Sequence, residues 1–156
     1  MTTEEMREKA VQMMTKRFHC SQAVLAVGQE KLGRKDEEVI RAMGAFGGGL
    51  GGNGEVCGAL VGGLGALGLR FSRGREEETE DPRMWGYSHE LVKRFKEEIA
   101  AYHGGIMCRD IAQVDWKNRD QVKGFYKSEK VLECARIVGE TARLIGELLE
   151  RSEEQA

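Results

Sequence analysis

Apolar residues recur at spacings of three and four along most of this chain, which is the period of one helix face. The period-two alternation that predicts half-buried strands is scarce, and proline, which interrupts helices, occurs once in 156 residues. A chain of this length can also bury a core without the help of disulfides. We therefore predict an all-α fold, a compact single-domain helical bundle that covers residues 1–156.

Capping and stop signals divide this bundle into helices. Thr2 and Glu5 have capping-box spacing at the start of the first helix, and Gly33 is placed to end the second. Asp81 and Pro82 start a helix that we expect to continue to the glycines at 104 and 105. The predicted helices cover about residues 2–18, 20–33, 36–46, 57–69, 82–104 and 128–151. A short helical turn begins at residue 108, and Asn118 with Gln121 is expected to cap another.

A glycine-rich loop between two of these helices, within the segment FGGGLGGNGEVCGALVGGLG at residues 46–65, delivers Cys57 to the start of an apolar helix. The helix dipole and the free amides of a first helical turn stabilise a thiolate, so we expect a reactive Cys57 with a lowered pKa. The glycines match G-x-G-x-x-G, but that pattern indicates a dinucleotide site only after a strand, and here a helix precedes it. Gly58 and Gly62 instead give the helix small faces that a neighbouring helix can approach closely.

The chain holds three further cysteines, Cys20, Cys108 and Cys134. No two of the four form the C-x-x-C pair that by itself predicts a zinc or thioredoxin-like site. Each one alone is explained equally well as a small buried hydrophobe. Three of the four, however, lie at or near predicted helix starts. We therefore expect the four thiols to meet at one redox or metal site.

Charge and hydropathy argue against several other classes of function. The chain has 24 basic and 26 acidic residues, without the basic excess of a nucleic-acid-binding protein. Its longest apolar run, residues 56–69, is too short to span a bilayer, and its first residues do not resemble a secretory signal. We expect a cytoplasmic protein with no membrane contact. In that reducing compartment, cysteines that act are metal ligands or transient redox thiols.

The sequence CGALVG at residues 57–62 matches the pattern CGAxxG and is preceded by FGGG at residues 46–49. Cys20 lies upstream in HCSQAV, and Cys108 and Cys134 lie downstream in CRD and ECARIV. Over almost the whole chain this pattern resembles the C_GCAxxG_C_C family of redox-active proteins. The resemblance implies a small helical protein with four functional cysteines. The cysteine pattern is also similar to a domain of split-Soret cytochrome c, a protein associated with an iron centre, but this chain has no C-x-x-C-H for covalent haem.

The leading hypothesis is an electron carrier that binds an iron-sulfur cluster, [2Fe-2S] in the first instance, and works with a redox partner protein. Its ligands would be the four cysteines, Cys20, Cys57, Cys108 and Cys134, with the backbone of four residues beside the cluster, Gly54, Gly58, Ala59 and Gly62. Two alternatives use the same thiols: a metal-free thiol/disulfide oxidoreductase in which Cys57 attacks, and a helical protein with structural zinc. The last helix also offers a surface for a homodimer.

Overall fold

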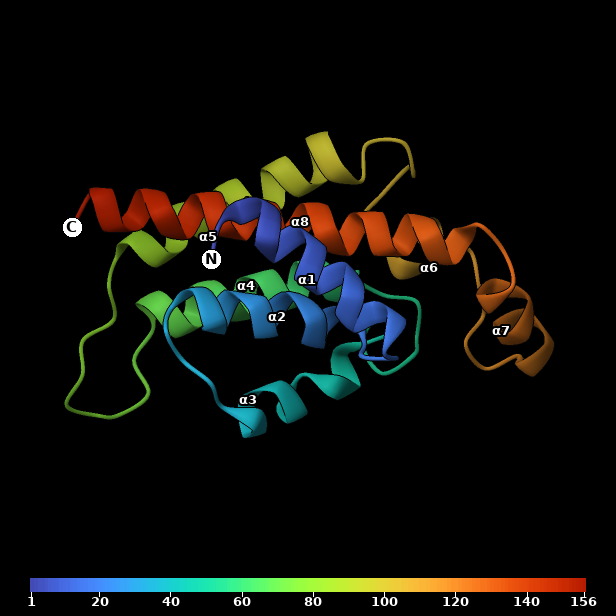
Figure 1. Cartoon of the computed structure of the whole chain (residues 1–156), viewed down its shortest axis with the longest axis horizontal. Helices are drawn as coiled ribbons and strands as arrows, with labels where there is room; N and C mark the ends of the chain where they lie inside the picture. The colour runs from blue at the N-terminus through green and yellow to red at the C-terminus, as the bar shows by residue number, and fades with distance from the viewer.

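The long C-terminal helix α8, Lys130–Glu154, packs against most of the other helices (Figure 1). In this computed structural model, which describes residues 1–156, the chain is all-helical, as predicted. Helices α1 (Thr3–Thr15), α2 (Cys20–Lys31) and α4 (Gly58–Phe71) all pack on α8, and α2 also packs on α1 and on α4. Their apolar faces meet in one main core whose most buried members include Val27, Leu67 and Ile145.

The remaining elements surround this core. They are α3 (Glu37–Ala42), the 3-10 turn η1 (Gly44–Phe46), α5 (Arg83–Arg94), the π-helical turn η2 (Phe95–Ile99), α6 (Cys108–Ile111) and α7 (Arg119–Tyr126). Figure 1 shows α7 at one end of the molecule, beside the first turns of α8, and both chain termini toward the other end. No helix combines the length and the apolar character that crossing a membrane requires.

Several helix boundaries lie where the capping signals predict them. The Thr2 hydroxyl accepts a hydrogen bond of 3.1 Å from the Glu5 amide, and the Glu5 carboxylate accepts one of 2.7 Å from the Thr2 amide. Gly33 follows α2 with φ +73°, the left-handed conformation typical of a helix stop. At the start of α7, the Asn118 side chain accepts a hydrogen bond of 3.1 Å from the Gln121 amide.

The predicted helix from residue 82 to the glycines at 104 and 105 is wrong at its end. The backbone widens into η2, closes with a 2.8 Å hydrogen bond from the Ala100 amide to the Phe95 carbonyl, and then leaves the helix. Phe95 and Ile99 are thereby both buried in the core. Tyr102, which falls within the range predicted as helix, is 93% exposed.

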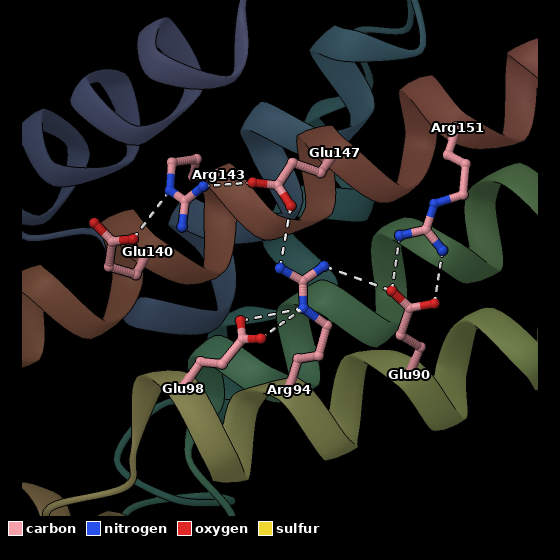
Figure 2. Close-up of polar contacts among 7 residues, drawn as sticks. All are labelled: Glu90, Arg94, Glu98, Glu140, Arg143, Glu147 and Arg151. Carbon is pink, nitrogen blue, oxygen red and sulfur yellow. Dashed lines mark hydrogen bonds and ion pairs between the residues drawn. The ribbon is translucent and has the colours of Figure 1, made fainter.

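A network of charged side chains ties α5 and η2 to α8 (Figure 2). Arg94 contacts Glu98 of η2 at 3.1 Å and Glu147 of α8 at 3.2 Å. Arg151 of α8 forms two hydrogen bonds, of 2.7 and 2.8 Å, with Glu90 of α5. The seven members are Glu90, Arg94, Glu98, Glu140, Arg143, Glu147 and Arg151. Single exposed pairs contribute little, about 0–1 kcal/mol each, but here each of the three arginines is paired with at least one glutamate.

Candidate four-cysteine site

All four cysteines lie on the wall of one cavity of about 90 Å³. Cys20 is the first residue of α2, Cys57 caps the start of α4, Cys108 is the first residue of α6, and Cys134 lies on the second turn of α8. All four are free thiols; Cys57 and Cys108 are buried, and the other two are partly buried. Four separate elements thus contribute one cysteine each to the wall of the same cavity.

A short antiparallel backbone contact positions Cys57 and Cys108. Val56 and Met107 form an isolated β-bridge, flanked by hydrogen bonds from the Cys57 amide to the Ile106 carbonyl, at 2.9 Å, and from the Cys108 amide to the Glu55 carbonyl, at 2.6 Å. In such a ladder the two residues that follow the bridged pair are diagonal neighbours on the same face. The bridge therefore turns two cysteines that are 51 positions apart toward the same side.

The glycines of CGAxxG let α2 approach α4 closely. A β-carbon at position 58 would lie 2.5 Å from the Cys20 sulfur, and one at position 62 would lie 2.4 Å from the Ser21 carbonyl oxygen. Gly49 makes room for a third cysteine, Cys108. Its φ is +70°, and a β-carbon at position 49 would lie 2.6 Å from the β-carbon of Cys108. These glycines leave the space that the thiols and their backbone occupy.

Burial raises the pKa of all four thiols. The pKa of Cys20 rises to about 11 and that of Cys134 to about 12, first because of burial and then because the neighbouring thiols repel a second negative charge. Amide hydrogen bonds from Ser21 and Gly48 lower the pKa of Cys20, and an indole hydrogen bond from Trp116 lowers that of Cys108, but neither cause outweighs burial.

The predicted lowering of the Cys57 pKa is therefore wrong. Cys57 does stand at the start of α4, and the Ala59 amide does act to lower its pKa. The residue is only 7% exposed, however, and burial among apolar side chains raises the pKa well above 9.0. The free energy that a thiolate loses when it is removed from water here is larger than the stabilisation that one helix start provides. At neutral pH the thiols are protonated.

The rest of the cavity wall is mostly apolar. Besides the thiols, its ionisable members are Arg17 and His19, from the turn between α1 and α2, and Tyr126, at the end of α7. On the α7 side the wall is aromatic, and it contains one functional candidate that the sequence analysis missed, Trp116. Its indole Nε1 donates a hydrogen bond to Cys108 Sγ at 3.3 Å. The available signal was a tryptophan eight positions after a cysteine and outside every predicted helix.

The glycines and the alanine expected beside a cofactor lie in different places. Gly58 lines the cavity, whereas Gly62 lies in the contact between α2 and α4. Ala59 is buried behind Cys57, and Gly54 lines a separate surface hollow next to Arg109. No three histidine, cysteine, aspartate or glutamate side chains are grouped closely enough to hold a metal ion, so the four thiols do not form a preassembled site for one ion. Four cysteines on one cavity wall are a donor set that occurs both in iron-sulfur proteins and in structural zinc sites.

Comparison with known proteins gives one result. The model of a family described as "Putative redox-active protein (C_GCAxxG_C_C)" matches residues 18–148, a range that contains all four cysteines and the whole wall of the cavity except Met14 and Arg17. No curated protein and no solved structure matches the chain.

Proposed function

Because this chain belongs to the C_GCAxxG_C_C family, whose members are described as redox-active, we propose that it is an electron carrier with an iron-sulfur cluster held by its four cysteines. The observation that carries the proposal is the position of all four thiols on the wall of one cavity. Four thiolates are the number that a [2Fe-2S] cluster takes as ligands. Such a cluster, when bound, would supply reversible electron transfer.

The chain's own residues would do three things for that centre. Cys20, Cys57, Cys108 and Cys134 would be its ligands. The amide and indole N–H groups that lower the pKa of the bare thiols would donate hydrogen bonds to the ligand sulfurs, and such bonds shift a reduction potential. The apolar wall would exclude water from the centre.

The acidity of the thiols supports a metal centre over metal-free disulfide exchange. Exchange begins when a thiolate attacks a disulfide, and burial keeps these thiols protonated at neutral pH. A metal ion deprotonates the thiols that bind it, so a raised pKa lowers the apparent affinity for the metal without preventing binding. We also place the carrier in the cytoplasm, since four unpaired thiols suit a reducing compartment.

The test is anaerobic purification of three proteins, followed by visible absorption and by iron, sulfide and zinc analysis. Wild type is compared with Cys57→Ala, which removes one sulfur, and with Val131→Ala, which truncates a thiol-free side chain on the same cavity wall. We expect iron with acid-labile sulfide in wild type and in Val131→Ala, and a loss of both in Cys57→Ala. Circular dichroism of each protein shows whether it is folded.

Two outcomes would overturn the proposal. Zinc without iron or sulfide, lost in Cys57→Ala, would establish the structural zinc alternative. A colourless protein without metal, in which oxidation reversibly pairs the thiols, would establish the thiol/disulfide alternative.

A further inference from the structure

Trp116 connects the cavity to the outer surface. Its indole Nε1 donates a hydrogen bond to Cys108 Sγ at 3.3 Å, inside the cavity. The same side chain also forms part of the wall of three open hollows on the surface. A molecule that binds over these hollows would therefore contact a ring that is itself in contact with one of the four sulfurs.

Neighbouring groups hold the indole in place. Its ring stacks edge-on against Phe125 with 5.2 Å between the ring centres. The glycine loop packs against the indole on another side, where a β-carbon at Gly48 would lie 3.4 Å from Trp116 Cδ1. A surface that is already ordered loses little side-chain freedom when a partner binds, which favours binding.

The surface around Trp116 is basic. Lys117, Arg119 and Lys123 line the hollows, and none of the three forms an ion pair. Arg109 also lines one hollow, where it pairs with Glu55 at 3.4 Å. Asp115 is the single acidic side chain on the walls of the three hollows. On the α5–α8 face, by contrast, the arginines are paired with glutamates (Figure 2).

We propose that this surface, which we call the Trp116 face, is the docking site of an acidic redox protein. Its members are Trp116, Lys117, Arg119, Val122 and Lys123. Electron-transfer complexes are small and short-lived, and they suit an aromatic centre with a charged rim. Proteins of opposite charge associate faster, so a basic surface indicates that the partner is acidic. The inference rests on the proposed function, because it assigns the partner of the same four-cysteine site.

Nuclear magnetic resonance of the full ¹⁵N-labelled chain tests the proposal. The chain has two tryptophans, so Trp116 and Trp85 each give one indole N–H signal. The probe is an acidic flavodoxin, and a basic cytochrome c is its control. We expect flavodoxin to shift the Trp116 signal and the α7 amides but not Trp85, with shifts that weaken as salt is added. Cytochrome c should shift neither signal.

Charge reversal provides the matched control. Trp85 is 59% exposed and lines another hollow together with Lys93 and Lys96, neither of which forms an ion pair. No cysteine lines that hollow. Lys117→Glu/Lys123→Glu should weaken flavodoxin binding on the order of tenfold. Lys93→Glu/Lys96→Glu should leave it unchanged, although it makes the same change in net charge.

Four outcomes would overturn the proposal: no binding of flavodoxin, shifts centred on Trp85, equal weakening by both double variants, or a Trp116 signal that moves with protein concentration alone. The last would identify a second copy of this chain as the occupant. Because the titration reports binding only, iron and sulfide analysis of the same samples tests the proposed function separately. A loaded protein that does not bind flavodoxin would overturn the docking site and leave the cluster in place.

Discussion

Gly62→Ala tests whether the close approach of α2 and α4 requires glycine. The new β-carbon would lie 2.4 Å from the Ser21 carbonyl oxygen and 3.1 Å from the Ser21 carbonyl carbon. An ordinary carbon–oxygen contact is about 3.3 Å, so the two helices would have to separate by about 1 Å. Both obstructing atoms belong to the backbone of α2, which cannot rotate away as a side chain can.

The expected change in the free energy of unfolding follows from two opposing effects. Overpacking a well-packed contact costs about 1–3 kcal/mol, and a backbone obstacle places this case at the upper end. Alanine within a helix recovers about 1 kcal/mol relative to glycine. The net loss is about 2 kcal/mol, which lowers Tm by about 4–8 °C in a chain of this length. Cys20 precedes Ser21, so the displacement of α2 also moves one sulfur and should reduce the iron content.

Gly68→Ala is the matched control on the same helix. Nothing lies within 4 Å of a β-carbon at this position, so only the helix propensity changes and Tm should rise by about 2–4 °C. Thermal unfolding is followed by far-ultraviolet circular dichroism under reducing conditions. Glycine-to-alanine substitution should thus lower Tm at position 62 and raise it at position 68, six residues further along the same helix. If Gly62→Ala is neutral or stabilising, the packing argument for CGAxxG is wrong.

Three further predictions follow from the site and its surroundings. Gly58→Ala places a β-carbon 2.5 Å from the Cys20 sulfur, which can rotate away, so the fold should survive while iron and sulfide per protein fall; unchanged iron content would contradict this. The pKa of Cys20 is raised to about 11 and that of Cys134 to about 12, so the metal-free folded chain keeps protons that the unfolded chain loses above 9.0. The stabilisation from these two thiols should be fully present below pH 9 and be lost as the pH rises through 11–12, which would be measured as a falling urea midpoint of unfolding. The urea midpoint of Cys134→Val should fall less over the same range. Hydrogen bonds from Arg136 lower the pKa of Glu133 from 4.5 to about 2, so this carboxylate stabilises the fold above pH 4.5 and loses that effect as the pH falls toward 2. The Tm difference between wild type and Glu133→Gln should accordingly be largest near pH 6 and should disappear near pH 2. A difference that stays constant with pH would refute the stabilising role of the Glu133 carboxylate.

The helices were predictable where their signals are local. The Thr2 and Glu5 capping box, the Gly33 stop and the Asn118 cap each depend on residues within one turn, and each is found where the sequence places it. The end of the helix after Pro82 was not predictable in this way. It is decided by the burial of Phe95 and Ile99 against other elements, which the helical period alone does not contain.

The site was predictable in its residue types but not in its arrangement. Cys57 and Cys108 face the same side because of a two-residue bridge that no periodicity indicates. The predicted direction of the Cys57 pKa shift was wrong because the sequence shows only a helix start, whereas burial depends on what the other helices place around the sulfur. Trp116 was missed because its importance comes from a hydrogen bond across a loop.

The two glycines of CGAxxG are explained by the packing around the thiols rather than by a dinucleotide. Gly58 and Gly62 are four residues apart, so they lie on one face of α4, and α2 crosses that face at Cys20 and Ser21. One glycine makes room for the sulfur and the next for the backbone that carries it. The spacing in CGAxxG therefore describes a single helix contact: its cysteine contributes one thiol from α4, and its two glycines admit a second thiol from α2. A side chain at either glycine position would push the two sulfurs apart, which links the packing of this pair of helices directly to the chemistry proposed for the cavity.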